Sequence, residues 1–154
     1  MTNKYMLAYD IAVKTGVFTD DELECLHEEL MDLVALSAYP GDVSDRTSDL
    51  FLLSDDQTGF AMAGPLDMTK GSYMLYWIAV EPSFHGKMVA QELLTKVEAY
   101  VAAAGGKRIF IETSSTDKFA RPRNFYFKSG YYHTAILMNY YSEGDSKCVF
   151  LKTL

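Results

Sequence analysis

Two long stretches of the chain carry apolar side chains at the spacing of an amphipathic helix. The first follows TDDE at 19–22, where Thr19 and Glu22 can form a capping box, and predicts a helix to about residue 37. The second follows Pro82 and stops at the glycine pair 105–106, which predicts a helix over about 90–104. A shorter helix is predicted in RPRNFYFKSG, residues 121–130, with Pro122 in its first turn.

Short apolar runs between these helices predict strands. DLFLLSD and GFAMAG, separated by a three-residue turn, indicate a hairpin. YMLYWIAV, residues 73–80, is apolar nearly throughout, which is typical of a central strand covered on both faces. Further strands are predicted at RIFIETS, YYHTAILM and KCVFLKTL, and AYPGDVSDRTSD is interpreted as a loop. We therefore expect one α/β domain over residues 1–154, with a mixed sheet flanked by helices.

The composition is that of a well-packed globular protein. At 154 residues and 49% hydrophobic content, the chain can bury about two thirds of the surface that it exposes when unfolded. No apolar run reaches the roughly 18 residues of a membrane span, and the amino terminus lacks a secretory signal, so we expect a cytoplasmic protein without a membrane segment. Cys25 and Cys148 lack metal-ligand spacing, which favours two buried free thiols over a disulfide and predicts no metal site.

Charge is distributed unevenly along the chain. The net charge of -7 argues against nucleic acid as a partner. Residues 1–64 hold thirteen acidic and three basic side chains, whereas residues 65–154 hold eight acidic and eleven basic ones. An anionic ligand is therefore expected on the carboxyl-terminal part and a cationic one on the amino-terminal part, unless the asymmetry is an ordinary uneven surface.

The stretch EPSFHGKMVAQELL, residues 81–94, leads a strand into a helix through a tight turn. Such a turn presents unbonded backbone N–H groups and the positive end of the helix dipole, which together favour a phosphate. Every strand-to-helix turn has this property, so the neighbouring segments decide how it is interpreted. They are FIETSS, FYFKSGYY and the terminal NYYSEGDSKCVFLKTL.

With LYWIAVEPSFHGKMVAQELL, these segments resemble the GCN5-related N-acetyltransferase (GNAT) superfamily, and its stand-alone bacterial members in particular. The resemblance covers most of the chain and includes the order of its elements. It implies a GNAT-like, mostly antiparallel mixed sheet. It also implies an acyl-CoA-dependent N-acetyltransferase, which moves acetyl from acetyl-CoA to a primary amine of a small molecule by direct attack and needs no metal.

The resemblance assigns the loop and the preceding strand to the cofactor. The family pattern Q/R-x-x-G-x-G/A, whose backbone N–H groups hold the CoA pyrophosphate, falls on His85, Gly86, Lys87, Met88, Val89 and Ala90. Met88 replaces the middle glycine, whose missing Cβ permits unusual φ angles and a close ligand approach. The replacement predicts weakened rather than abolished CoA binding. Backbone N–H groups of Ile78, Ala79 and Val80 are expected to face the cofactor and the developing oxyanion.

The resemblance also suggests residues for proton transfer. Tyr126 takes the position of a tyrosine that protonates the departing thiolate, which a phenol of pKa near ~10 suits, although a core aromatic is the alternative. Glu112 interrupts an apolar strand, and we expect it to be a buried general base with a raised pKa. Two alternatives remain: Glu112 could be a carboxylate that pairs with a nearby cation, and Glu81 could be the general base. Arg123 and Lys128 are expected to contact CoA phosphates or to lie on a solvated face.

Other functions remain open at this point. The chain could be a catalytically idle acyl-CoA-binding or regulatory module, a protein or peptide N-acetyltransferase, or a structural dimer that binds no CoA. Tyrosine pairs at 131–132 and 140–141 could join the edges of two subunits in a homodimer, although we expect burial within one subunit. The acidic amino-terminal helix suits a cationic amine acceptor.

Overall fold

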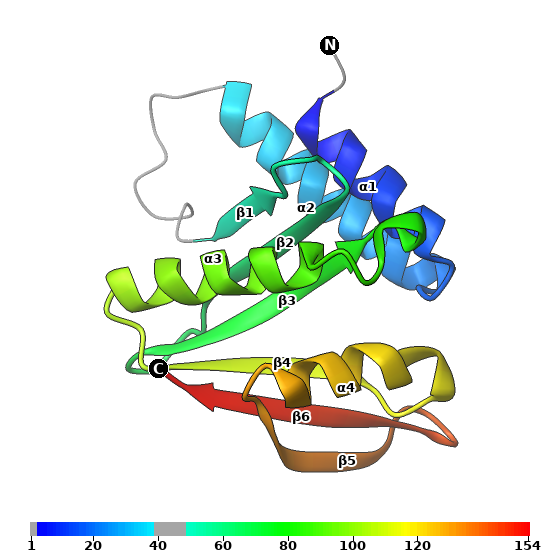
Figure 1. Cartoon of the computed structure of the whole chain (residues 1–154), viewed down its shortest axis with the longest axis vertical. Helices are drawn as coiled ribbons and strands as arrows, with labels where there is room; N and C mark the ends of the chain where they lie inside the picture. The colour runs from blue at the N-terminus through cyan, green and yellow to red at the C-terminus, as the bar shows by residue number, and fades with distance from the viewer. Residues whose placement is uncertain (1–2, 39–48) are drawn as a thin grey trace. The chain divides into compact units, whose positions relative to one another are not determined.

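The computed structural model describes residues 3–38 and 49–154, which form four α-helices and six strands (Figure 1). The helices are α1 (Lys4–Thr15), α2 (Asp20–Ala38), α3 (Val89–Ala103) and α4 (Ala120–Lys128). The strands are β1 (Leu50–Leu53), β2 (Gly59–Pro65), β3 (Ser72–Val80), β4 (Arg108–Ser114), β5 (Tyr132–Ser142) and β6 (Asp145–Thr153). The loop predicted at 38–49 lies almost wholly outside the described residues.

The strands form one mixed sheet in the order β1-β2-β3-β4-β6-β5. β3 and β4 are parallel, while β4 with β6 and β5 with β6 are antiparallel. Because a parallel pair needs a crossover, α3 connects β3 to β4. The predicted mixed α/β fold is therefore confirmed, including the central place of β3.

The chain divides into two compact units. The first comprises Met1–Met62 and Trp77–Thr95, and the second comprises Ala63–Tyr76 and Lys96–Leu154. β2, β3 and α3 each begin in one unit and end in the other. A single domain over 1–154 stays a prediction.

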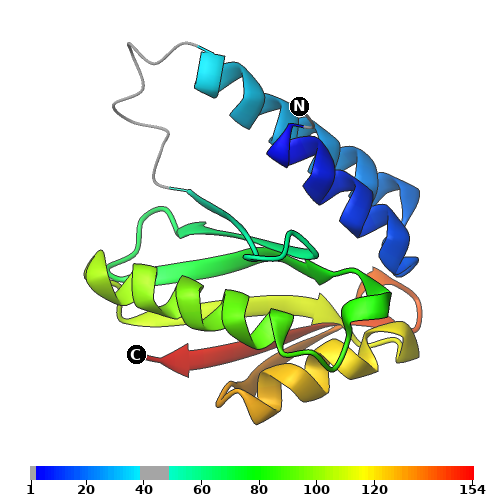
Figure 2. The ribbon, with the colours of Figure 1, turned by 45° about the horizontal axis from the view of Figure 1, so that its top comes forward.

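In the first unit, α1 and α2 cover one face of β2 and the end of β3 (Figure 2). The shared core is apolar and buried: Tyr5, Ala8, Ile11, Ala12, Leu26, Leu30, Phe60, Met62 and Ala79. Gly59 allows α3 to approach β2, since a Cβ at this position would lie 3.0 Å from Leu93 Cδ1 and 3.0 Å from Val89 Cγ1. The start of α3 is therefore fixed against the sheet by close packing.

The helix starts differ in how well the sequence predicts them. The capping box of α2 is confirmed, because Thr19 N–H donates to Glu22 Oε2 at 2.7 Å and Glu22 N–H donates to Thr19 Oγ1 at 3.2 Å. The hydrophobic pattern does not predict α1. Its buried face includes Ala8 and Ala12, small residues that give little hydrophobic contrast, although Asn3 caps its start by accepting from Tyr5 N–H at 3.0 Å.

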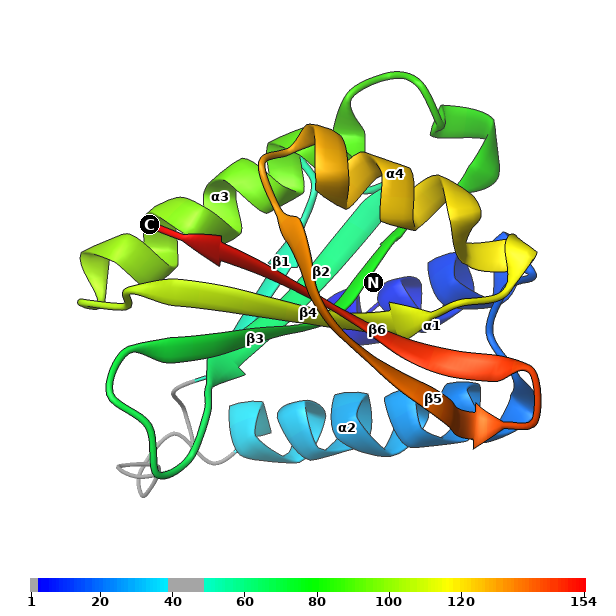
Figure 3. The same ribbon diagram turned by 90° about the horizontal axis from the view of Figure 1, so that it is seen from below.

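In the second unit, α4 lies beside β6 (Figure 3). Aromatic rings join the two elements: the Tyr126 ring lies 5.8 Å from that of Phe150 and 6.4 Å from that of Tyr131. Tyr131 donates its hydroxyl to Glu98 Oε1 at 3.2 Å, and Lys152 Nζ lies 3.1 Å from the same oxygen. These hydrogen bonds and the ion pair join α3 to β6.

Three expectations about burial are wrong. Cys148 is buried as expected, but Cys25 is exposed on α2. Tyr76 is exposed, so β3 is not covered throughout. Of the paired tyrosines only Tyr131 is buried, because the rest lie on β5, whose eleven residues are all exposed.

Candidate functional site

The loop after β3 is anchored to the strand by backbone and ring contacts. Glu81 N–H donates to Thr58 O at 2.8 Å, and Pro82–Phe84 then form a short 3-10 turn. His85 Nε2 lies 3.0 Å from Val80 O, so the tautomer protonated at Nε2 donates to the end of β3. His85 therefore fastens the loop to the strand in place of the Gln or Arg of the family pattern.

Two loop residues have the left-handed backbone conformation for which glycine is normally used. Gly86 has φ +78° and Met88 has φ +62°. The Met88 side chain is 71% exposed, so it extends away from the packed interior. A non-glycine residue in this conformation costs about 1–2 kcal/mol, which the surrounding turn sustains. The loop thus keeps a glycine-like conformation although it holds a methionine.

Four N–H groups in and after this turn have no acceptor among the residues that the structure describes. They belong to Gly86, Met88, Val89 and Ala90. Glu92 N–H donates to Met88 O at 3.0 Å as the first bond of α3, so Val89 and Ala90 occupy its unbonded first turn. With the positive end of the helix dipole, these donors form a site suited to a phosphate or pyrophosphate.

Lys87 adds a cation to this loop. Its backbone N–H donates to Phe84 O at 3.3 Å, and its ammonium group lies 5.0 Å from the centre of the Phe84 ring. Both Lys87 and Met88 are exposed, which leaves the loop open to a solvent-borne anion. Glu81, the alternative base, pairs instead with Lys14 of α1 at 3.4 Å.

The first unit thus brings the predicted loop residues next to the end of β3. Ala79 and Val80 are buried, and Ala79 faces the core under α1 and α2. Ile78 and Val80 face the opposite side, because side chains alternate along a strand. The predicted cofactor residues from Ile78 to Ala90 therefore form one continuous structure.

Sequence reasoning misses a polar pair beside this segment. Trp77 Nε1 donates to Glu29 Oε2 at 2.7 Å, and the Phe18 ring meets the indole edge at 5.4 Å. Cys25 Sγ donates to Glu29 Oε1 at 3.5 Å, and burial, followed by the Glu29 carboxylate, raises the pKa of that thiol. The only hint in the sequence is that Trp77 is the one side chain with an N–H donor in the apolar run 73–80.

Tyr126 lies in the second unit and is buried. Its ring is 5.7 Å from that of Phe125, and desolvation by burial raises its pKa far above the ordinary value. The hydroxyl therefore stays protonated at neutral pH. Burial is typical of a core aromatic, and the raised pKa makes the phenol a weaker proton donor, so the catalytic assignment stays a prediction.

The expected burial of Glu112 is wrong. Its side chain is 38% exposed, and its Oε2 lies 2.8 Å from Lys147 Nζ. Burial disfavours the charged Lys147, but the hydrogen bond to Glu112 and the neighbouring Tyr140 outweigh it and raise the Lys147 pKa. Glu112 is thus a carboxylate that pairs with a cation, which was the alternative interpretation. Burial, the reason for predicting that it is the general base, does not apply.

Arg123 and Lys128, the two residues of α4 predicted to contact CoA phosphates, have different surroundings. Arg123 Nη1 donates to Ser114 O at 2.7 Å and to Thr116 O at 2.8 Å, which ties the β4–α4 connection together. Lys128 is exposed in the last turn of the helix. Arg123 therefore has a structural role through Nη1, and the contacts of Arg123 and Lys128 with CoA phosphates stay predictions.

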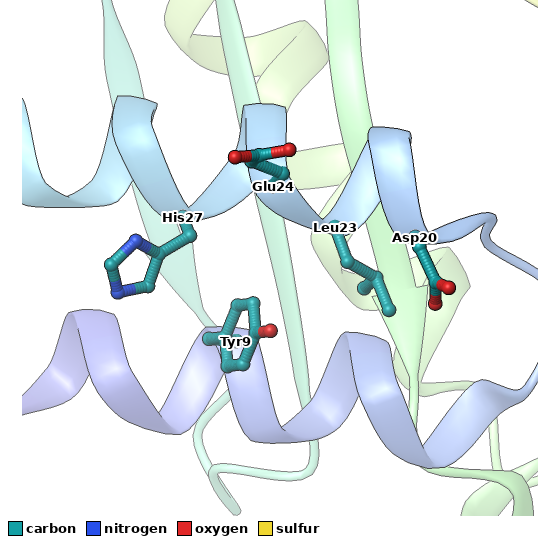
Figure 4. Close-up of a pocket in the computed structure, with 5 residues that line it drawn as sticks. All are labelled: Tyr9, Asp20, Leu23, Glu24 and His27. Carbon is teal, nitrogen blue, oxygen red and sulfur yellow. The ribbon is translucent and has the colours of Figure 1, made fainter.

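A separate hollow lies between α1 and α2 (Figure 4). It has a volume of about 370 Å³ and is lined by Tyr9, Asp20, Leu23, Glu24 and His27. Tyr9 and His27 meet edge to face at 5.5 Å. None of the predicted cofactor residues lines this hollow.

The described residues contain neither a cluster of metal-ligating side chains nor a helix suited to crossing a membrane. No three His, Cys, Asp or Glu side chains of residues 3–38 and 49–154 gather as metal ligands. In the same part of the chain, no helix has the length and apolar character needed to cross a membrane.

Comparison with known proteins gives a consistent result. The family model described as the acetyltransferase (GNAT) family matches residues 15–131. No curated protein matches the sequence. A Desulfovibrio desulfuricans protein assigned to the GNAT family is 29% identical, with 99% of this chain and 94% of that one covered and a TM-score of 0.84.

Two solved structures with bound cofactor share the fold. One is an aminoglycoside 6'-N-acetyltransferase complexed with coenzyme A, 19% identical over 97% of this chain and 89% of that one, with a TM-score of 0.69. The other is a GNAT family acetyltransferase of Elizabethkingia anophelis with acetyl-CoA bound, also 19% identical, over 63% and 69%, with a TM-score of 0.56. Since the family model spans more than half of the sequence, the chain belongs to the acetyltransferase (GNAT) family.

Proposed function

We propose that this protein transfers the acetyl group of acetyl-CoA to a primary amine of a small molecule. The observation that carries the proposal is the loop before α3, where Gly86, Met88, Val89 and Ala90 hold unbonded N–H groups at a helix start. Membership of the acetyltransferase family supports it, as do two structural neighbours that hold coenzyme A or acetyl-CoA.

The loop and the strand end have separate roles in this proposal. The unbonded N–H groups hold the pyrophosphate, and Lys87 adds a positive charge that neutralises it further. Backbone N–H groups of Ile78, Ala79 and Val80 orient the thioester and stabilise the oxyanion. Acetyl-CoA supplies an activated acyl group, and the acceptor nitrogen forms a bond to its carbonyl carbon as the bond to sulfur breaks.

Tyr126 is the proposed proton donor for the departing thiolate. Its phenol is protonated at neutral pH, but burial raises its pKa and makes it a weaker acid than a solvated phenol, so the proposal rests on its place in the family pattern and not on this shift. With Glu112 paired to Lys147 and Glu81 to Lys14, we propose that the acceptor amine gives up its proton to solvent. Rates should therefore rise with pH as more of the free amine becomes neutral.

Glu29 is proposed to bind the acceptor. Trp77 fixes its carboxylate beside β3, one residue before the segment Ile78–Val80. A carboxylate next to two aromatic rings suits an ammonium or amino-sugar group, through charge and through cation–π contact. The acidic α2, with Asp20, Asp21 and Glu22 in its first turn, adds to this preference for cations.

A second candidate is a module that binds acyl-CoA without transferring it. The pairing of Glu112 with Lys147 supports it, because an ion-paired carboxylate is a weaker general base than an unpaired one. The two candidates share the cofactor loop and differ only in turnover.

Thiol release with a panel of amines separates them. Polyamines, amino sugars, lysine-like compounds and a peptide would be tested with wild type, Tyr126→Phe and Tyr100→Phe, the last changing an exposed tyrosine of the same unit. We expect turnover by wild type and a loss of about 10²–10⁴ in kcat for Tyr126→Phe alone, with acetyl-CoA affinity unchanged. Saturable acetyl-CoA binding with no turnover on any amine would establish the second candidate.

A further inference from the structure

Met88 puts an oxidisable side chain on the loop proposed to hold the cofactor. The side chain is 71% exposed, so an oxidant in solution can reach its thioether sulfur. The family pattern has glycine at this position, and glycine offers no side chain to modify. A chemical change at Met88 would therefore act directly on the loop, in a way that a glycine at this position does not permit.

Exposure alone does not distinguish Met88 from other methionines of the chain. The large exposed hydrophobic side chains of the described residues include Met31 (44%), Met68 (106%), Met88 (71%) and Met138 (71%). Met31 lies on α2, Met68 lies between β2 and β3, and Met138 lies on β5. Met68 also shares the left-handed backbone, with φ +59° against +62° for Met88. Met68 is therefore a matched control that lies outside the loop.

Met88 occupies the N-cap position of α3. The helix begins at Val89, and Glu92 N–H donates to Met88 O at 3.0 Å as its first bond. An oxygen on an N-cap side chain, as in Ser or Asn, accepts from N–H groups of the first turn. A thioether is only a weak acceptor, and the N–H groups of Val89 and Ala90 have no acceptor among the described residues. The reduced methionine thus leaves these donors open to an anion.

Oxidation gives this side chain the acceptor that it lacks. Hydrogen peroxide transfers one oxygen atom to the sulfur: the O–O bond breaks, an S–O bond forms, the sulfur loses two electrons and the peroxide is reduced to water. The sulfoxide oxygen is as many bonds from Cα as the amide oxygen of glutamine. Oxidised Met88 therefore has the length and the acceptor of a polar N-cap residue.

We propose that Met88 is a redox-sensitive modification site, and that its sulfoxide caps α3 and competes with the CoA pyrophosphate for the loop. The inference rests on the proposed function, because it takes this loop to be the cofactor site. The sulfoxide oxygen is tethered to the loop, so its effective concentration at the Val89 and Ala90 donors is high. Methionine sulfoxide reductases reverse the oxidation. Peroxide therefore lowers the affinity for acetyl-CoA, and enzymatic reduction restores it.

Calorimetric titration of the full chain with acetyl-CoA, before and after treatment with hydrogen peroxide, tests the proposal. Dithiothreitol is added after the peroxide, because it reduces an oxidised Cys25 thiol and leaves sulfoxides intact, and mass spectrometry measures the sulfoxide at each methionine. We expect the dissociation constant to rise about tenfold in oxidised wild type and oxidised Met68→Leu. It should not change with oxidation in Met88→Leu, and sulfoxide reductases should restore the wild-type value.

Met88→Gln tests the same idea without an oxidant. Its amide oxygen replaces the sulfoxide oxygen, whereas Met88→Leu has a similar size and no acceptor. The glutamine variant should therefore bind acetyl-CoA more weakly than the leucine variant. Circular dichroism verifies that each variant folds.

Several results would overturn the proposal. They are an unchanged affinity in wild type whose Met88 is fully oxidised, an equal loss in oxidised Met88→Leu, no sulfoxide at Met88, and equal dissociation constants for the glutamine and leucine variants. Failure of the proposed function gives a different result, because the reduced wild type would then not bind acetyl-CoA at all. That result would refute the cofactor site, and this proposal with it.

Discussion

Replacing Met88 by glycine should stabilise the loop before α3. Met88 has φ +62°, and a non-glycine residue in that conformation costs about 1–2 kcal/mol, whereas glycine adopts it freely. The methionine side chain is 71% exposed, so its removal forfeits little apolar burial. The gain in the folded state is therefore close to the whole backbone cost.

Part of this gain is lost in the unfolded chain. Glycine gives the unfolded state more conformational freedom, which costs about 0.5–1 kcal/mol. The balance is a stabilisation of at most about 1.5 kcal/mol, and each kcal/mol raises Tm by about 2–4 °C for a chain of this length. Acetyl-CoA affinity should rise less than about tenfold, because the N–H groups of Gly86, Val89 and Ala90 are already unbonded in the methionine form.

Thermal unfolding and calorimetric titration with acetyl-CoA measure both effects. Met88→Ala is the control, because alanine removes the long side chain but keeps the Cβ and therefore the backbone cost. The glycine variant should melt above the alanine variant. Equal Tm values for the two would refute the argument from strain. Binding by the glycine variant alone would mean that the methionine side chain closes the site.

Two further predictions concern Glu29 and the buried tyrosines. Glu29→Gln should raise the KM of cationic amines about tenfold and leave the KM of acetyl-CoA unchanged in steady-state assays; an equal loss with a neutral-headed amine would contradict a charge contact. Burial raises the pKa of both Tyr126 and Tyr131, the latter also through Glu98, so both stay protonated in the folded protein at a pH where the unfolded chain ionises. Their contribution to stability is therefore complete below about pH 10 and falls above it, by up to about 1.4 kcal/mol per pH unit for each tyrosine. In urea unfolding from about pH 9 to 12, the free energy of unfolding should fall less steeply with pH for Tyr131→Phe than for wild type. Identical slopes would contradict the link between the buried tyrosine and alkaline stability.

Local sequence signals predict most of the fold. The capping box at Thr19 and Glu22 and the apolar run of β3 are each set by neighbouring residues, so periodicity and turn chemistry find them. α1 escapes the same reasoning because Ala8 and Ala12 form part of its buried face. Its burial depends on the tertiary contacts of the first unit and not on hydrophobic contrast along the helix.

The candidate site also combines features that local sequence predicts with features that depend on long-range contacts. The place of the phosphate loop follows from a strand, a turn and a helix start, all local features. The state of Glu112 depends on Lys147, which β6 brings beside it from far along the chain. The contact of Glu29 with Trp77 likewise spans 48 residues. No single-sequence pattern contains such pairings.

The exposed β5 illustrates a further limit. Aromatic and β-branched residues predict a strand, but they do not say whether its faces are covered within the chain. Tyr132 and Tyr140 are exposed because β5 is an edge strand, and strand order is a property of the whole topology.

The most direct test of the acetyltransferase proposal is a titration of the backbone amide resonances with acetyl-CoA. If the loop holds the pyrophosphate, the N–H signals of Gly86, Met88, Val89 and Ala90 should shift most, and an acetyl-thioester that lacks the pyrophosphate should leave them in place. Shifts confined to other parts of the chain, or none at saturating acetyl-CoA, would contradict it.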